Sequence, residues 1–492
     1  MSGGRTKTHN NDKYVRKWWE VENYKRWQPY ANGGEFRKWY GNNFDVVDWS
    51  QEATELYASK GGLYNKKFVG KSGICWNLIT SAKNGFRIKE SEFHYSSGSP
   101  TIFSDQKSSD SMYLGFLNSI VSYYLLQVIN PTINTTVNSV LCLPFDSGKY
   151  EYRISEIVND CLDSSKIDWD SFEISWNFLE NPLLANKHSN KLSECFKVWE
   201  KTTGDRFSLL KKLEEELNSI FIEIYDLQDE LTPEVEDKDV TVRKADVERD
   251  VRSFLSYLVG VIFGRYRLDK PGLAFAGGEF NLDEFGSYKP DKDNIIPITA
   301  EHYFEDDIVS KITELVAIIY GNDTLNENLQ FIATHLGMKD SETPEDTIRR
   351  YFMKDFYKDH LKTYQKRPIY WLYDSGKQDG FKALVYMHRY TADTTGIVRV
   401  DYLHKMQKIY TSEIDRMIDM AENSNNTREI AQAEKRKEKL VKQLKETKEY
   451  DEKIAHLAIS RIAIDLDDGV KVNYEKVQTG QDGNKLSILA KI

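Results

Sequence analysis

A leucine-rich seam between residues 210 and 231 is the feature that most constrains the fold of this chain. Its apolar residues recur at alternating steps of three and four; they are Leu210, Leu213, Leu217, Ile220, Ile224, Leu227 and Leu231. This spacing predicts one helix with a continuous apolar stripe, and Pro233 ends the pattern. Such a helix must pack on another. A core-facing position and an intermolecular coiled coil are equally compatible with it. We predict a spacer helix in residues 191–233, not a catalytic element.

The rest of the chain predicts an α+β fold in four further regions. Residues 1–190 have the pattern of a mixed α/β domain, and residues 234–400 that of a second, mixed but mostly helical domain. Residues 401–465 indicate a long helical hairpin, and residues 466–492 a tail of short strands. With 492 residues the chain is long enough to bury several cores.

Local patterns predict the elements of the first region. Residues 74–81 alternate like a half-buried strand, and Asn84-Gly85 is a hairpin turn signal before a second short strand. An amphipathic helix is expected over residues 113–128. Residues 132–143 are rich in β-branched side chains, and we expect a further strand there.

The C-terminal hairpin has a clear turn. Residues 423–427 are polar, and Asn426 with Glu429 forms a plausible helix N-cap. Beyond residue 465 we expect short strands around the turn Asp482-Gly483.

The charge is unevenly distributed along the chain. The net charge is −10, yet residues 1–100 contain 16 Lys and Arg against 10 Asp and Glu, and residues 343–410 contain 13 against 8. Acidic residues concentrate between them, as at 214–216 and 234–239. This distribution fits a basic groove on an acidic body as well as it fits ordinary charge scatter.

The cysteines and apolar runs predict a soluble, cytoplasmic protein. Cys75, Cys142, Cys161 and Cys195 form no CxxC pair, and we expect reduced, mostly buried thiols. The longest apolar stretches are too short or too polar to span a bilayer. The nine histidines are dispersed without metal-ligand spacing, so no metal site is predicted.

Motifs along nearly the whole chain carry a family resemblance. They are residues 10–21, 36–43, 46–49, 73–81, 97–103, 114–124, 130–134, 143–144, 215–231, 263–266, 366–372, 381–384 and 467–474. Together they resemble PglX, the adenine-specific DNA methyltransferase family of BREX phage-defence systems. The resemblance implies that residues 1–190 form the target-recognition domain, which gives the enzyme its DNA specificity.

The catalytic motifs of such enzymes are absent from this sequence. Adenine methyltransferases hold the extruded base with an Asn/Asp/Ser-Pro-Pro-Tyr/Phe loop and admit S-adenosylmethionine through a Gly-rich turn after a strand. None of the 11 prolines is adjacent to another, and no such Gly-rich turn occurs. We therefore predict no catalytic residue and no cofactor in this chain, with S-adenosylmethionine bound by a catalytic half outside it. A split-gene product, an exchangeable cassette and a truncated copy all fit.

DNA contacts are expected from polar and basic side chains near the predicted hairpin and the loop at residues 96–100. The candidates are Arg37, Lys38, Thr80, Lys83, Arg87, Ser97 and Ser99. Arg37 and Arg87 rank highest because a guanidinium can grip guanine in two places. For each candidate, simple exposure or a turn hydrogen bond is the alternative.

The expected partners are double-stranded DNA, a methyltransferase catalytic domain or subunit, and other BREX proteins. No association with a membrane is expected. Two other functions remain compatible with the sequence. The chain could be a specificity subunit that serves a restriction-modification enzyme in trans. The seam helix and the hairpin could instead form a protein-interaction scaffold that does not bind DNA.

Overall fold

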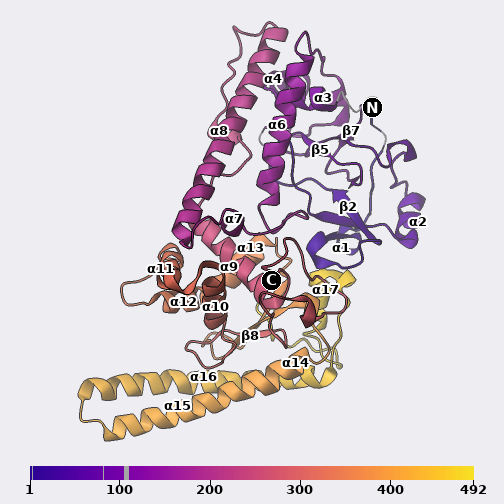
Figure 1. The fold of residues 1–492 in the computed structure, drawn as a ribbon. Helices are drawn as coiled ribbons and strands as arrows, with labels where there is room; N and C mark the ends of the chain where they lie inside the picture. The colour runs from indigo at the N-terminus through magenta and orange to yellow at the C-terminus, as the bar shows by residue number, and fades with distance from the viewer. Residues whose placement is uncertain (3, 81–82, 105–109) are drawn as a thin grey trace. The chain divides into compact units, whose positions relative to one another are not determined.

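The computed structural model describes residues 1–2, 4–80, 83–104 and 110–492 (Figure 1). By contact the chain forms two compact units. Unit 1 comprises Met1–Trp18, Asn23–Pro182 and Lys197–Asp246; unit 2 comprises Trp19–Glu22, Leu183–Phe196 and Val247–Ile492. The predicted α+β class is confirmed, because helices dominate and the strands form three small sheets. The five regions expected from the sequence are thus grouped into two units.

The strands of unit 1 form two small sheets. The strands are β1 (Val15–Lys17), β2 (Trp27–Ala31), β3 (Asp45–Asp48), β4 (Gly73–Cys75), β5 (Arg87–Lys89), β6 (His94–Tyr95) and β7 (Thr101–Ile102). One sheet has the order β1-β3-β2-β6, in which only β2 and β6 are parallel. The other has the order β5-β4-β7 and is antiparallel. The predicted antiparallel strand pair is present, since Ile74 pairs with Ile88, but the first strand ends at Cys75. The two strands are separated by residues 76–86, so Asn84-Gly85 does not close a two-residue hairpin turn as predicted.

Helices pack beside these sheets. They are α1 (Asn11–Tyr14), α2 (Gln51–Ser59), α3 (Asp110–Asn118), α4 (Ile120–Ile129), α5 (Val137–Leu141), α6 (Glu151–Asp170) and the long α8 (Leu192–Ile224), with short 3-10 helices η2 (Lys66–Phe68) and η4 (Asp237–Asp239). The segment η1 (Trp18–Glu20), α7 (Pro182–Ala185) and α8 each contribute residues to both units.

The leucine seam faces the core of unit 1. Leu210 and Leu217 are buried there together with Leu114 of α3 and Ile157 of α6. The structure therefore gives the seam a core-facing position. The helix itself ends at Ile224, earlier than the seam, and the last seam leucines pack on the same core from the turn that follows.

The single helix expected over residues 113–128 is two helices. Ser119 interrupts it: its hydroxyl accepts a hydrogen bond from Ser122 N as the N-cap of α4 and donates one to Phe116 O. The axes of α3 and α4 are bent by 72° at this point. A serine in this role favours a new helix start over continuation.

The strand expected over residues 132–143 is limited to an isolated antiparallel bridge of Asn134 with Ile79, and the prediction is wrong beyond it. Residues 137–141 form α5, and Thr136 caps it by accepting a hydrogen bond from Ser139 N. The side-chain cap and the burial of Val140 in the core outweigh the β preference of the branched residues. Within the described residues, no single helix is long and apolar enough to cross a membrane. The bent pair α3 and α4 has the length and composition for this only when its two helices are taken together.

Unit 2 is mostly helical. Its helices are α9 (Val247–Phe263), α10 (Ile308–Tyr320), α11 (Leu325–His335), α12 (Pro344–Lys354), α13 (Phe356–Thr363), α14 (Thr394–Ile397), α15 (His404–Asn423), α16 (Thr427–Ser460) and α17 (Gly469–Lys476), with the short turns η5 (Leu282–Glu284), η6 (Asn322–Thr324), η7 (Met387–Arg389), η9 (Leu466–Asp468) and the π-helical η8 (Val398–Leu403). Its strands β8 (Ile295–Pro297), β9 (Tyr370–Asp374) and β10 (Lys382–Tyr386) form an antiparallel sheet of order β8-β10-β9.

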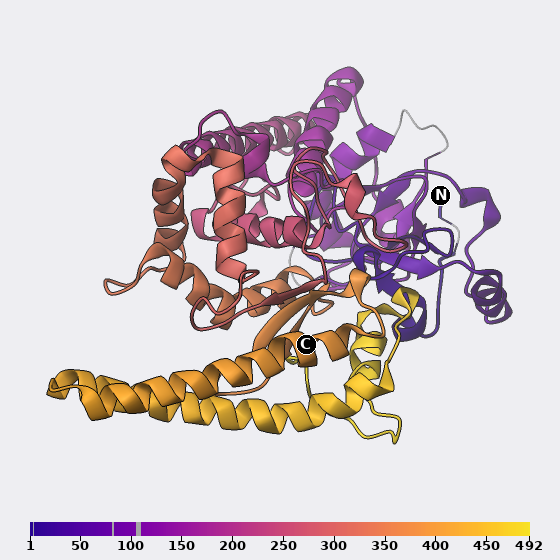
Figure 2. The ribbon, with the colours of Figure 1, turned by 60° about the horizontal axis from the view of Figure 1, so that its bottom comes forward.

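The predicted helical hairpin is confirmed. Helices α15 and α16 run side by side, as Figure 2 shows, and Asn426 caps α16 by accepting a hydrogen bond from Arg428 N. The Asn426 amide also donates to Glu429 at 3.2 Å, which is the expected cap partnership. Leu440 and Ile454 of α16 pack into the core of unit 2.

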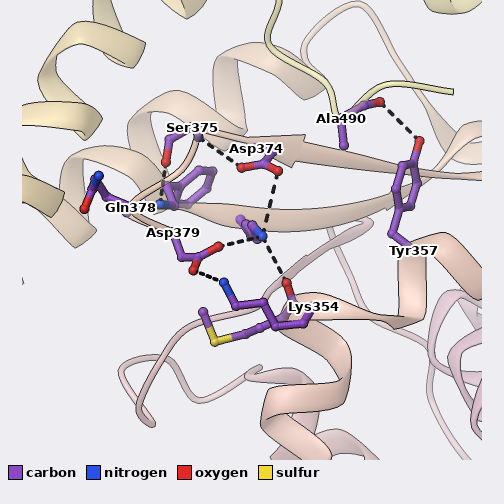
Figure 3. A network of polar contacts seen from close by, with 12 residues as sticks. Lys354, Tyr357, Asp374, Ser375, Gln378, Asp379 and Ala490 are labelled. Atoms are coloured by element: carbon purple, nitrogen blue, oxygen red, sulfur yellow. Dashed lines mark hydrogen bonds and ion pairs between the residues drawn. The ribbon is translucent and has the colours of Figure 1, made fainter.

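The loop between β9 and β10 is held by the buried Lys382 and by partly buried carboxylates (Figure 3). The Lys382 ammonium lies 2.8 Å from Asp379 and 3.8 Å from Asp374, and it donates to Met353 O at 3.0 Å. Glu446 of α16 accepts hydrogen bonds from the Ser375 hydroxyl and from the backbone amides of residues 378 and 380. These contacts tie the hairpin to the sheet.

The tail of strands expected over residues 466–492 is wrong in its first part. Residues 469–476 form α17, since Val470, Tyr474 and Val477 recur at helical spacing and pack into the core. After α17 the chain makes isolated antiparallel bridges, Thr479 with Lys485 and Tyr373 with Leu489. The cysteines agree with expectation, because all four are free thiols and all except Cys142 are buried.

Unit 2 contains a cluster of carboxylates around Tyr402. Its hydroxyl lies within hydrogen-bond distance of both Asp293, at 2.8 Å, and Asp306, at 2.6 Å, while Asp291 and Asp293 both accept from Ile295 N. Burial, followed by the neighbouring Asp293 charge, raises the pKa of Asp291 to about 7. The folded protein therefore holds a proton at Asp291 that the unfolded chain, with a pKa of about 3.9, releases at lower pH.

We predict that the Asp291→Asn variant gains stability relative to the natural protein as the pH rises. A raised carboxyl pKa contributes stability that is complete below about pH 4 and is lost as the pH rises through about 7. The amide cannot ionise and avoids this loss. Urea unfolding at pH 5 and pH 8 measures the difference, with the exposed Asp323→Asn as control. A difference between variant and natural protein that is the same at both pH values would contradict the prediction.

Candidate nucleic-acid interface

Residues 37–39 form an anchor segment that is held by buried carboxylates. The Arg37 guanidinium forms an ion pair with Asp168 of α6, and Lys38 forms one with Glu214 of α8. Both cations are buried, with 5% and 7% of their surface exposed. Glu214 also accepts a hydrogen bond of 2.7 Å from the indole of Trp39. The anchor segment is thus tied to two helices that follow it far along the chain.

Arg87 packs directly on the anchor segment. Its guanidinium donates to Arg37 O at 3.2 Å and to the side-chain oxygen of Asn77 at 3.0 Å, and only 2% of its surface is exposed. Burial lowers the pKa of Arg87. Gly85 lies so close that an added Cβ would meet Arg37 O at 2.2 Å. The backbone at residues 85–87 and the anchor segment therefore fix one another.

The structure separates the seven predicted DNA contacts into two groups. Arg37, Lys38, Arg87 and Ser99 are buried, so in this conformation they serve the fold and do not face a duplex. The guanidinium groups of Arg37 and Arg87 already have acceptors inside the protein in this conformation, which a sequence pattern does not show.

Thr80, Lys83 and Ser97 are partly exposed, and DNA contact by them stays a prediction. Lys83 forms an ion pair of 2.6 Å with Asp239.

Two chain segments form a ridge beside these residues. Thr80 N donates to Ile133 O at 3.0 Å, and Thr135 N donates to Leu78 O at 2.9 Å. Between them lies an antiparallel bridge that pairs residues 79 and 134. We call residues 78–80 and 133–135 the ridge. Its inner side rests on the buried Trp76, whose indole donates to Thr135 O at 2.8 Å.

A groove lies on each side of the ridge. The first groove encloses about 160 Å³, and its polar lining is Thr80, Asn84, Gln127, Asn130, Thr132 and Thr135. The second encloses about 550 Å³, and its polar lining includes Arg5, Ser96, Ser97, Thr101, Asn134 and Asn138. Predicted candidates therefore lie in both grooves, Thr80 in the first and Ser97 in the second.

The grooves are free of acidic side chains. Within the described residues, neither lining contains Asp or Glu, although the chain has 77 such residues. Amide and hydroxyl groups predominate, and these are the groups that read base edges. A smaller cavity of about 50 Å³ beside Lys83 differs, because Glu214, Glu234 and Asp239 line it.

A sequence signal for this face exists and was missed. The run from residue 111 to 145 has no charged residue, and neither have residues 76–80 and 95–104. These three runs supply most of both linings. Gln127, Asn134 and Asn138 lie in these uncharged runs, which neither charge nor motif distinguishes, whereas Arg5 lies outside them.

Exposed cations border the second groove. Backbone hydrogen bonds connect residue 6 to residue 95 and residue 7 to residue 62, so the segment carrying Arg5 lies between the groove and residues 60–71. That stretch contains Lys60, Lys66, Lys67 and Lys71 and no acid. All four lysines are exposed, and no ion pair joins them to the described part of the chain. The arrangement suits a polyanion beside an uncharged groove.

The described residues do not fit a methyl-donor site. Within the part of the chain that the structure covers, no strand runs through a Gly-rich turn into a helix; Gly33 and Gly34 follow β2, but a loop comes next. Among the described residues, no group of His, Cys, Asp or Glu side chains could hold a metal ion.

Comparison with known proteins defines the class. No family model matches the chain. The adenine-specific methyltransferase PglX of Lacticaseibacillus casei (strain Zhang) is 40% identical over 500 residues, which cover 96% of this chain and 41% of the relative. The adenine-specific methyltransferase BrxX of Escherichia coli O9:H4 (strain HS) is 32% identical over 506 residues, which cover 94% of this chain and 41% of that protein.

Nearly the whole chain is therefore homologous to part of known adenine-specific methyltransferases, and it spans 41% of the length of these curated relatives. The resemblance to PglX expected from the motifs is confirmed.

We predict that Glu214→Ala lowers the free energy of unfolding of this unit by about 3–5 kcal/mol, because it leaves the Lys38 ammonium buried without its carboxylate. The control is Glu156→Ala on α6, which removes one side of an exposed ion pair with Arg153 and should cost at most about 1 kcal/mol. Chemical denaturation followed by tryptophan fluorescence measures both. Equal losses of unfolding free energy in the two variants would show that the buried ion pair stabilises the protein no more than the exposed one.

Two glycine substitutions should have opposite effects. Gly85→Ala should destabilise the protein by about 1–3 kcal/mol or more, since its Cβ would overlap the backbone oxygen of residue 37. Gly204→Ala, inside α8 with nothing within 4 Å of the added Cβ, should stabilise it by about 0.5–1 kcal/mol. Thermal unfolding compares them. A neutral Gly85→Ala would mean that the anchor segment is not tightly packed on residue 85.

Proposed function

We propose that this chain carries the DNA-recognition portion of an adenine-N6 DNA methyltransferase of a BREX phage-defence system. Unit 1 binds the duplex through the two grooves and the ridge, and the methyl transfer takes place in a catalytic domain or subunit that is not part of the described residues. The observation that carries this proposal is the acid-free pair of grooves in a chain of net charge −10.

The homology supports the choice of ligand. The two relatives are adenine-specific methyltransferases by name, and the described residues offer no fitting site for S-adenosylmethionine. In the proposed division of labour, that cofactor and the extruded adenine are held by the catalytic part. Other proteins of the defence system are further proposed partners.

Each part of the interface has its own task in this proposal. Arg5 and the lysines of residues 60–71 contact phosphates and position the duplex. Thr80, Ser97 and the amides of the grooves face base edges. The ion pair between Lys83 and Asp239 lines the smaller cavity next to the first groove and contributes to the charge of that cavity.

Salt-dependent DNA binding tests the proposal. We predict that the purified chain binds duplex DNA with an affinity that falls steeply with salt concentration. Arg5→Ala and the double variant Lys66→Ala/Lys67→Ala should each weaken binding to all sequences alike and flatten the slope of log K against log salt by about 1 per lost phosphate contact. Fluorescence anisotropy with a labelled duplex at several salt concentrations measures this.

The matched control is Lys201→Ala, an exposed lysine on α8 outside the grooves, which should leave the slope unchanged. Absence of binding to any duplex, alone or beside a methyltransferase catalytic partner, would overturn the proposal in favour of a protein-interaction scaffold. With the partner present, S-adenosylmethionine-dependent methyl transfer distinguishes a working specificity part from an inert one.

A further inference from the structure

The outer face of the ridge carries an apolar and an amide side chain as neighbours. Ile79 and Asn134 are partners in its antiparallel bridge. The two backbone hydrogen bonds of the ridge lie on either side of this pair, so it is a non-hydrogen-bonded pair. In such pairs both side chains stand on the same face, with Cβ atoms about 4.5–5.5 Å apart.

Both side chains are available for contact. Ile79 is 62% exposed, so its aliphatic side chain is accessible at the outer face of the ridge. Asn134 is exposed, and its side-chain amide makes no hydrogen bond to the described part of the chain. Its two donors and two acceptor positions are therefore free to bind a ligand.

The backbone beneath the pair is rigid. The inner side of the ridge rests on buried Trp76 and on Thr135, whose hydroxyl accepts a hydrogen bond from the Asn84 amide. The branched side chain of Ile79 has few rotamers of its own. The backbone of the pair is thus held in place before any ligand arrives, which lowers the entropy cost of binding.

We propose that Ile79 and Asn134 together read one A·T base pair from the major groove; this inference rests on the function proposed above. A two-stranded ribbon fits the major groove. There an A·T pair displays the N7 and N6 groups of adenine beside the 5-methyl group of thymine, and an asparagine amide binds the former while an aliphatic side chain contacts the latter. A G·C pair offers neither the methyl group nor that donor–acceptor pattern.

The surroundings favour DNA as the occupant. The grooves on both sides of the ridge contain no Asp or Glu among their described lining residues, and Arg5 lies in the second groove. The approach of phosphate groups along either side of the ridge is therefore not opposed by a carboxylate. An acidic or apolar protein partner would not require amide and hydroxyl groups along both grooves.

Selection of binding sites tests this inference. The full chain is used to enrich duplexes from a random pool, and the enriched sequence is compared with those obtained with Ile79→Ala and Asn134→Ala. We expect both variants to lose A·T preference at one and the same position, by about 5- to 100-fold, with the other positions retained. Val128→Ala, on α4 and 72% exposed but outside the groove linings, is the matched control and should change nothing.

Base analogues at that position give an independent readout. Replacing thymine by uracil removes the methyl group and should weaken the natural chain as much as Ile79→Ala does, with no further loss when both changes are combined. Replacing adenine by 7-deazaadenine should be non-additive with Asn134→Ala in the same way. Circular dichroism of each variant shows that it is folded.

The outcomes distinguish this inference from the proposed function. If the natural chain enriches a sequence and both variants enrich the same one, Ile79 and Asn134 do not read bases, while DNA recognition stands. If the two variants relax different positions, the joint reading of one pair is overturned. If the natural chain enriches no sequence at all, the proposed function fails together with the inference.

Discussion

The pairing of Arg37 and Lys38 with Asp168 and Glu214 is the interaction on which unit 1 depends. A buried ammonium or guanidinium is costly without a carboxylate, so the anchor segment has one stable place, against α6 and α8. The backbone oxygen of Arg37 then accepts a hydrogen bond from the Arg87 guanidinium, and it leaves no room for a side chain at residue 85. The loop that leads from β4 to β5 is thereby fixed at one end, and this loop contains half of the ridge.

This use of charge explains how an acidic protein can present a face for a polyanion. Several cations of the first hundred residues lie inside; Lys89, for example, donates to three backbone oxygens, and burial lowers its pKa to about 8. Asp168 and Glu214, which pair with Arg37 and Lys38, are themselves buried. What remains at the grooves is an acid-free lining, with Arg5 and exposed lysines at the second groove, which attracts phosphates without contacting any particular base.

Unit 2 uses the same principle for a different purpose. Glu446 of the long hairpin accepts three hydrogen bonds from the loop between β9 and β10, and Lys382 is enclosed by Asp374, Asp379 and a backbone oxygen. A hairpin that bears many charges is therefore joined to the sheet by its inward-facing acids, while its other charges remain in water. The same residues could be counted as a charge run in the sequence, but only their positions reveal which of them hold the fold together.

The sequence by itself determined the long helices, the α16 cap at Asn426 and the resemblance to PglX, because each of these depends on local spacing or on motifs that neighbours in the chain carry. The tertiary structure decided the rest. It made residues 137–141 and 469–476 helical where strands were expected, since the Thr136 cap of α5 and core contacts of both helices outweigh local preference. It also buried the cations that ranked highest as DNA contacts and paired Ile79 with Asn134, because burial and cross-strand partners are set by contacts between distant segments.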